Sequence, residues 1–244
     1  MKAVVVAEIG SNWEGNVSKA KKIIKECRDA GADAVKFQMW RAKDLYSVTH
    51  PEWNIIKKSE VTFEKAKKFK EIADQLHIEF FCSVFYPEAV EFLEDLKVKR
   101  YKIASRTCLF KDPYSLETLQ AIAKTRKPVI ISMGMGGNRE KIKKIFERNE
   151  KTFCYCISEY PLEFQRINWK LALKFDGFSD HTMETTAPIL YATFKKQQNT
   201  PKIIIEKHVK LIDSKGPDAS TSIDTDKLKE LVSHIRLIEK GRFT

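Results

Sequence analysis

Short runs of β-branched and aromatic residues alternate along this chain with longer runs in which apolar residues recur every three or four positions. The short runs predict buried strands, and the longer runs predict amphipathic helices. This alternation is typical of βα units arranged around a parallel sheet. The predicted strands cover residues 3–9, 33–38, 78–83, 100–105, 128–133, 152–158, 175–180 and 202–208. The predicted helices cover residues 17–30, 62–76, 87–96, 114–125, 138–148, 166–173, 184–197 and 225–240.

Eight strands, each followed by one helix, predict a closed (β/α)8 barrel, also called a TIM barrel. We expect it to form a single domain over residues 1–244. A doubly wound open sheet has the same order of elements, and the pattern alone leaves it open. Ser18 is expected to cap the first helix, and Gly31 to end it. The longest connection, residues 39–61, is rich in aromatic and polar residues and predicts a functional loop such as a lid.

The composition indicates a folded protein from a reducing compartment. Apolar residues make up 43% of the chain, which is enough for a sizeable core. The five cysteines are odd in number, and their spacing matches neither a disulfide framework nor a paired zinc motif. No segment has the length and flanks of a signal peptide or a membrane span. We therefore expect a soluble cytoplasmic protein with no membrane partner.

The formal net charge of +11 raises the question of a polyanionic partner such as nucleic acid. The lysines cluster within residues 19–26, 65–71 and 141–147, where they are mixed with glutamate and with apolar residues at helical spacing. This pattern is typical of the solvated outer faces of surface helices. We therefore expect no nucleic-acid partner, although a basic surface can still steer an anionic substrate.

Polar side chains gather where the predicted strands end, which is where a barrel carries its catalytic groups. Lysine and glutamate are unusual there, because parallel strands are buried on both faces and an unpaired buried charge is costly. A functional interpretation is therefore favoured for the set. Its members are Glu8, Asn12, Lys36, Gln38, Ser83, Lys102, Ser105, Ser132, Ser158, Glu159, Tyr160, Ser179, Asp180, His181, Glu206 and His208.

His181 ends the seventh predicted strand and His208 ends the eighth, so neighbouring strands would hold two imidazoles at the same mouth. Two neutral imidazoles suit a divalent transition metal and leave open positions for a substrate, as Lewis-acid activation of a carbonyl requires. Either histidine alone is more often a structural residue with satisfied hydrogen bonds. The pair in register favours a metal site.

Lys36 and Lys102 interrupt otherwise apolar strands. They could neutralise a phosphate and a carboxylate, with the serine hydroxyls of the rim as further donors. An internal lysine–glutamate ion pair would instead be structural. A desolvated lysine can also form a Schiff base, which would make the protein a class I aldolase. A barrel that binds an anionic ligand without turnover is a third function.

The strand ends together form a series of motifs that resembles the N-acetylneuraminate (sialic acid) synthases. AEIGSNWEG is similar to the AEIG-x-N-H-x-G opening of that family, GADAVKFQ to its second strand and YKIAS to its fourth. KPVIISMGM is similar to the family's KPVILSTGM, and CISEYP, FSDHT, IEKHV and GPD follow in the family order. The resemblance therefore covers nearly the whole chain.

This resemblance implies a transferase that condenses phosphoenolpyruvate with the open-chain aldehyde of an N-acylated hexosamine or related aldose. A carbon–carbon bond forms at C3 of phosphoenolpyruvate, water adds at C2, and phosphate leaves by C–O cleavage. A divalent cation, Mn²⁺ or Mg²⁺, held by His181 and His208 would polarise the aldehyde. The implied partners are these small molecules, and the resemblance is compatible with a homodimer.

The resemblance also implies roles for the polar strand ends. The catalytic set would be Glu8, Lys36, Lys102, His181, Glu206 and His208, with the two glutamates near the metal and its water. Phosphoenolpyruvate would contact Lys36, Ser83, Lys102, Ser105, Ser132, Ser158 and Ser179. The sugar would contact Gln38, Phe85, Tyr160 and Asp218.

The chain departs from the family pattern mainly where the sugar is recognised. The family reads SGE or SGD after the fourth strand, whereas this chain reads SRT, with Arg106 and Thr107. We expect Thr107 to contact the sugar in place of the family carboxylate, and Arg106 to add positive charge that favours an acidic aldose over N-acetylmannosamine. Val84 replaces the proline of the family's TPF. We also expect the barrel to lack the family's C-terminal antifreeze-like domain.

Overall fold

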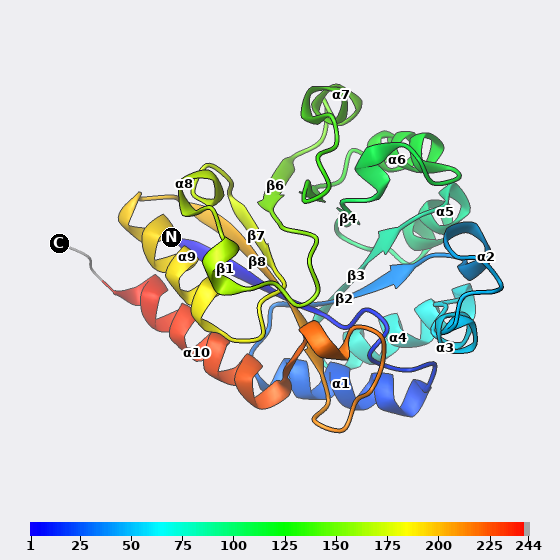
Figure 1. Cartoon of the computed structure of the whole chain (residues 1–244), viewed down its shortest axis with the longest axis horizontal. Helices are drawn as coiled ribbons and strands as arrows, with labels where there is room; N and C mark the ends of the chain where they lie inside the picture. Colours follow the sequence, from blue (N-terminus) through cyan, green and yellow to red (C-terminus); the bar gives the residue numbers. More distant parts are fainter. Residues whose placement is uncertain (242–244) are drawn as a thin grey trace.

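The computed structural model describes residues 1–241, which fold into a closed parallel barrel (Figure 1). The strands follow one another around the barrel in chain order, and β8 pairs with β1 to close it, whereas the short β9 pairs with the end of β8. The strands are β1 (Lys2–Glu8), β2 (Ala34–Met39), β3 (Glu79–Val84), β4 (Tyr101–Ile103), β5 (Val129–Ser132), β6 (Lys151–Tyr155), β7 (Gly177–Asp180), β8 (Lys202–Lys210) and β9 (Ile223–Asp224). The predicted (β/α)8 barrel is therefore confirmed, and the open sheet is excluded.

Helices lie around the outside of the barrel (Figure 1). Each strand from β1 to β8 is followed by one main helix, as the amphipathic pattern predicts. The main helices are α1 (Val17–Asp29), α4 (Phe63–Gln75), α5 (Pro87–Asp95), α6 (Ser115–Lys124), α7 (Arg139–Ile145), α8 (Trp169–Ala172), α9 (Thr186–Gln197) and α10 (Thr225–Lys240). The helix predicted over 166–173 is reduced to α8, which follows the 3₁₀ turn η2 (Phe164–Arg166). Within residues 1–241, no helix combines the length and apolar character that crossing a bilayer requires.

The lower half of the barrel interior is filled by an apolar cluster, which leaves the carboxyl ends of the strands as the polar half. Alternate residues of a strand face the same side of the sheet. The residue two positions after each residue of this apolar cluster therefore also points into the barrel, nearer the carboxyl end of its strand. In β1, β2 and β3 these residues are Glu8, Lys36 and Ser83. The strand period therefore places a polar layer directly above an apolar base. The cluster consists of Val4, Val6, Ala34, Phe81, Ile130, Cys154 and Ile204.

The long connection between β2 and α4 has structure of its own. It contains two short helices, α2 (Ala42–Leu45) and α3 (Trp53–Lys58). Trp40 and Ile56 from this connection pack with Phe85, which follows β3, in a separate buried cluster. The predicted loop is therefore anchored to the barrel by apolar contacts.

The amino end of α1 corrects the expected helix cap. Asn16 is the N-cap, and its Oδ1 accepts a hydrogen bond of 3.1 Å from the backbone N–H of Lys19. Ser18 lies inside the first turn and makes no cap hydrogen bond. Gly31 has a φ of +85° just beyond the helix, as expected for an exit glycine.

Asn16→Ala should lower the free energy of unfolding by about 1 kcal/mol, because it removes the acceptor for an end N–H group. Urea denaturation would measure the change. Ser18→Ala is the matched control and should stay within about 0.5 kcal/mol of the parent protein. A larger loss for Ser18→Ala than for Asn16→Ala would contradict the assigned cap.

Candidate active site

The carboxyl ends of the strands surround a cavity of about 400 Å³. All the residues predicted to be catalytic or substrate-binding line this cavity, with the exception of Thr107. Of the wider set of polar strand ends, Asn12, Glu159 and Asp180 do not line it. The cavity is therefore where the polar strand ends meet, as their positions predict. Those that line it are Glu8, Lys36, Gln38, Ser83, Phe85, Lys102, Ser105, Ser132, Ser158, Tyr160, Ser179, His181, Glu206, His208 and Asp218.

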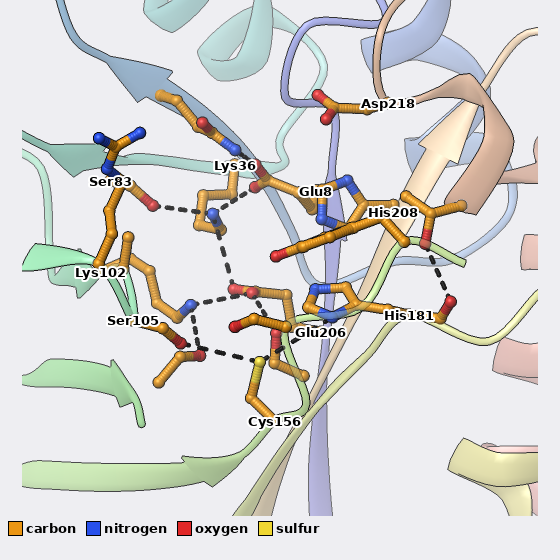
Figure 2. A pocket seen from close by; sticks show the side chains of 18 of the residues that line it. Glu8, Lys36, Ser83, Lys102, Ser105, Cys156, His181, Glu206, His208 and Asp218 are labelled. Carbon is orange, nitrogen blue, oxygen red and sulfur yellow. Dashed lines mark hydrogen bonds and ion pairs between the residues drawn. The ribbon is translucent and has the colours of Figure 1, made fainter. Parts of the chain in front are cut away.

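Glu206 lies at the centre of a charged network on the cavity floor (Figure 2). Its Oε1 accepts hydrogen bonds from Lys102 Nζ at 2.9 Å and from Ser179 Oγ at 2.8 Å. Lys102 Nζ also donates to Ser132 Oγ at 2.9 Å. These residues come from β4, β5, β7 and β8, so the network ties one side of the barrel together.

Lys36 makes the corresponding contacts on the other side of the floor (Figure 2). Its Nζ forms an ion pair with Glu8, donates to Ser83 Oγ at 2.9 Å and lies 3.7 Å from Glu206 Oε2. Gln38 Nε2 donates to Glu8 Oε1 at 2.6 Å. Lys36, Glu8 and Glu206 are all almost completely buried.

The two buried carboxyls differ in how firmly they are ionised. Burial raises the pKa of Glu206, but the ammonium groups of Lys102 and Lys36 outweigh burial and hold that pKa well below its usual range. Burial raises the pKa of Glu8, and Lys36 offsets this only in part. Burial lowers the pKa of Lys102, but Glu206 outweighs it and the net pKa is raised. Two cations therefore face one firmly ionised carboxylate, an arrangement that suits a small anion.

The two histidines face the same side of the cavity, with ring centroids 5.4 Å apart (Figure 2). The Nδ1 of His181 lies 2.7 Å from the carbonyl oxygen of Ile157, so this nitrogen carries the proton and donates, which leaves Nε2 free to act as a ligand. The Nδ1 of His208 is buried without a hydrogen-bond partner, and burial lowers the pKa of this imidazole.

Two imidazoles held in this way fit a divalent cation. Among residues 1–241, no group of three or more His, Cys, Asp and Glu side chains is arranged to hold a metal. A cation between His181 and His208 would therefore take its remaining ligands from water or substrate. That donor set leaves the open positions that the sequence predicts.

The mouth of the cavity carries an ion pair and a carboxylate. The guanidinium of Arg106 donates to both oxygens of Asp112, at 2.7 Å each. The Oδ2 of Asp218 accepts from the backbone N–H and the hydroxyl of Ser11, also at 2.7 Å each. Gly10 permits this, because a Cβ there would lie 2.4 Å from Asp218 Oδ2. Asp112 neutralises the charge that the sequence led us to expect at Arg106.

Thr107 does not line the cavity, contrary to the sequence prediction. β4 ends at Ile103, and the 3₁₀ turn η1 (Thr107–Leu109) begins with this residue. Thr107 is only 1% exposed, and its hydroxyl oxygen is buried without a hydrogen-bond partner. The turn therefore directs Arg106 to the cavity and Thr107 into the protein.

Sequence reasoning also missed residues that line the cavity. Cys156 lies between Cys154 of the apolar cluster and Ser158, so strand alternation was a signal that could have identified it. Tyr46 comes from the connection after β2, where no periodicity places a side chain. The other unpredicted lining residues are Ala104, Met135, Pro217 and Thr221.

Cys156 should react with iodoacetamide before the other cysteines at about neutral pH. Burial raises the pKa of its thiol, but His181, with Nδ1 4.0 Å from the sulfur, together with Lys102 and Ser105 outweighs burial and brings the pKa below its ordinary value. Burial raises the pKa of the other thiols. The thiolate, which is the reactive form, is thus most abundant at Cys156. Peptide mass spectrometry would find the label, Cys156→Ser is the control, and earlier labelling elsewhere would contradict the prediction.

Comparisons with known proteins show the family to which this chain belongs. The model of the NeuB family matches residues 23–242. The N,N'-diacetyllegionaminic acid synthase of Legionella pneumophila is 31% identical over 267 residues, covering 97% of this chain and 72% of the relative. The pseudaminic acid synthase of Campylobacter jejuni is 32% identical over 267 residues, covering 98% and 75%.

A solved structure shares the whole fold. The N-acetylneuraminic acid (sialic acid) synthetase of Leptospira borgpetersenii, in complex with citrate, superposes with a TM-score of 0.86 at 26% identity, over 100% of this chain and 87% of the other. The resemblance to the sialic acid synthases and the prediction of a transferase are therefore confirmed. The chain belongs to the NeuB family, whose sialic-acid-like synthases condense phosphoenolpyruvate with a sugar.

Proposed function

We propose that this chain condenses phosphoenolpyruvate with the open-chain form of an N-acylated aldose, and releases a 2-keto-3-deoxy sugar acid and phosphate. The observation that carries the proposal is the pair of buried lysines on the cavity floor. Lys36 and Lys102 each donate to a serine hydroxyl at 2.9 Å, and both face a cavity that also holds two imidazoles. Phosphoenolpyruvate has two anionic groups, so two ammonium groups with neighbouring hydroxyls match its charge.

The remaining contacts of the proposal follow the family resemblance and the lining of the cavity. Serine hydroxyls around the floor would complete the binding of phosphate and carboxylate, and side chains nearer the mouth would bind the sugar. The proposed phosphoenolpyruvate contacts besides the lysines are Ser83, Ser105, Ser132, Ser158 and Ser179. The proposed sugar contacts are Gln38, Phe85, Tyr160 and Asp218.

His181 and His208 would hold a divalent cation, Mn²⁺ or Mg²⁺. Such an ion, when bound, polarises the aldehyde oxygen as a Lewis acid. The anchoring of His181 Nδ1 by Ile157 and the unpartnered Nδ1 of His208 support this assignment.

The reaction depends on charge stabilisation and on the transfer of a proton. It needs no covalent nucleophile. C3 of phosphoenolpyruvate bonds to the aldehyde carbon, whose oxygen takes up a proton and becomes a hydroxyl. Water adds at C2 and loses one proton, which balances the proton taken up by the aldehyde oxygen. The new C2 hydroxyl then loses its proton and becomes the keto oxygen, while phosphate leaves with the electrons of the C–O bond and takes up that proton. The lysines would stabilise the anionic groups throughout. Burial raises the pKa of Glu8, whereas the two lysines lower that of Glu206, so Glu8 is the floor carboxyl better able to take part in proton transfer.

The same contacts argue against a Schiff-base aldolase. A nucleophilic lysine must lose its proton. Glu206 raises the pKa of Lys102, although burial lowers it, and Lys36 is ion-paired with Glu8. Neither lysine is therefore set up as an amine nucleophile.

The charge balance at the mouth favours a neutral aldose over an acidic one. Asp112 pairs with Arg106 through both of its oxygens, so little of the guanidinium charge is left for a substrate. The carboxylate of Asp218 faces the same space and would repel an anionic sugar. Hydroxyl and amide groups of a neutral N-acylated aldose can instead donate to it.

The function predicts that phosphate is released from phosphoenolpyruvate only when a suitable aldose and Mn²⁺ or Mg²⁺ are present. A panel should compare N-acetylmannosamine and a di-N-acetylated aldose with their phosphorylated or acidic counterparts, with mass spectrometry of the product. EDTA should abolish turnover and Mn²⁺ should restore it.

Three results would contradict parts of this proposal. Full activity of the His181→Ala, His208→Ala double variant would remove the metal assignment. Covalent labelling of a lysine by pyruvate and borohydride would favour the aldolase. No phosphate release with any aldose would favour the non-catalytic, anion-binding barrel.

Lys36→Ala and Lys102→Ala should each raise the KM for phosphoenolpyruvate by at least about tenfold, because a hydrogen bond from a charged donor contributes about 1.5 to 3 kcal/mol. Steady-state kinetics at saturating aldose would measure it. Lys127→Ala is the control, since Lys127 pairs with Glu94 away from the cavity and should keep the parent KM. An unchanged KM in both active-site variants would give these lysines a structural role.

A further inference from the structure

A lysine and an aspartate with no place in the cavity lie immediately next to the two histidines. Asp180 precedes His181 and Lys207 precedes His208. Because neighbouring residues of a strand point to opposite faces, these two side chains lie on the outside of the barrel wall while the imidazoles face the cavity. Lys207 Nζ and Asp180 Oδ2 are 2.6 Å apart, and both side chains are 0% exposed.

The contacts of this pair enclose the backbone of His181. Asp180 accepts from the backbone N–H of Thr182 at 3.0 Å and from its hydroxyl at 2.9 Å. Lys207 donates to the carbonyl oxygen of Thr182. The residues on both sides of His181 are thereby tied to one side chain of β8.

The strand pairing itself does not reach His181. The β7–β8 pairing ends with Asp180 opposite Lys207, whereas His208 is still paired with Glu8 of β1. His208 is therefore placed by the sheet, whereas His181 lies one residue beyond the last β7–β8 pairing, where its carbonyl oxygen accepts from the backbone N–H of Leu162 and the hydroxyl of Thr221, both at 2.9 Å. The ion pair adds a link from β8 itself to the residues on both sides of His181.

We propose that the Asp180–Lys207 ion pair is a positioning device that sets His181 relative to His208. The effect on metal affinity rests on the proposed function, because the spacing of the imidazoles would determine how tightly a divalent cation binds. Stability alone does not account for the pair, since apolar residues of similar volume can replace buried ion pairs without loss. Groups that orient metal ligands, in contrast, typically affect metal affinity by about 10- to 100-fold.

Two variants break the pair, and a third serves as a matched control. Lys207→Met removes the ammonium, and Asp180→Asn removes the charge while keeping the shape and an acceptor for Thr182. The control is Lys195→Met, because Lys195 pairs with Asp176 at 3.0 Å just before the other end of β7. All three lose a lysine–aspartate pair beside the same strand, but only two lose it next to the histidines.

The first measurement is ¹⁵N NMR of the histidine rings in the metal-free protein, with His181→Gln and His208→Gln used for assignment. We expect Asp180→Asn and Lys207→Met to shift the His181 resonances and to weaken its Nδ1–H tautomer, whereas Lys195→Met leaves them at their parent positions even where it lowers the Tm. The second measurement is Mn²⁺ affinity by electron paramagnetic resonance. The Kd should rise at least about tenfold in the two pair variants and less than about twofold in the control.

Unchanged His181 resonances in folded Asp180→Asn and Lys207→Met proteins would overturn the proposal. An equal shift in Lys195→Met would also overturn it, because the effect would then be general destabilisation. If Lys207→Met does not fold, Asp180→Asn decides between these outcomes. If the parent protein binds no Mn²⁺, the metal assignment of the proposed function fails, and the ring resonances alone decide whether the pair positions His181.

Discussion

The balance of charge inside the barrel is the constraint on which the site depends. Glu8, Lys36, Lys102 and Glu206 are buried together, and each would be costly without its partners. Glu206 is held firmly ionised by both lysines, whereas burial favours the protonated form of Glu8. The network is therefore stable without a ligand, and the ammonium groups of Lys36 and Lys102 can still bind an anion. An anion that enters the cavity can take over part of the role of Glu8.

The sequence predicts this arrangement well because it follows from the strand period. The residue two positions beyond each inward apolar residue must also point inward, as in Val6 to Glu8 and Ala34 to Lys36. A closed barrel then brings residues that are far apart in the sequence to one cavity. Within paired strands, the direction of a side chain follows from its position in the strand, so it can be predicted once the strand is correctly located. This is why the floor residues and His208 could be placed by counting.

Prediction fails where the pairing stops. β4 is only three residues long, and the turn after it decides that Arg106 rather than Thr107 faces the cavity. The position of Asp112, which neutralises Arg106, depends on the same turn. Tyr46 reaches the mouth from a connection whose two short helices are fixed by apolar contacts. Turn geometry and local packing decide such positions, and neither has a period that a sequence displays.

The two ends of the cavity therefore differ in what holds them. The floor is built from paired strands, whose geometry changes little without disrupting the barrel, so Lys36 and Lys102 stand on the rigid part. The mouth is built from connections, with Arg106, Asp112 and Asp218 held by side-chain contacts instead of by the sheet. Substitutions there can alter charge and shape without disturbing the lysines below. A barrel of this kind can keep the chemistry of one substrate while the partner sugar changes, which is consistent with a family named for several different sugar acids.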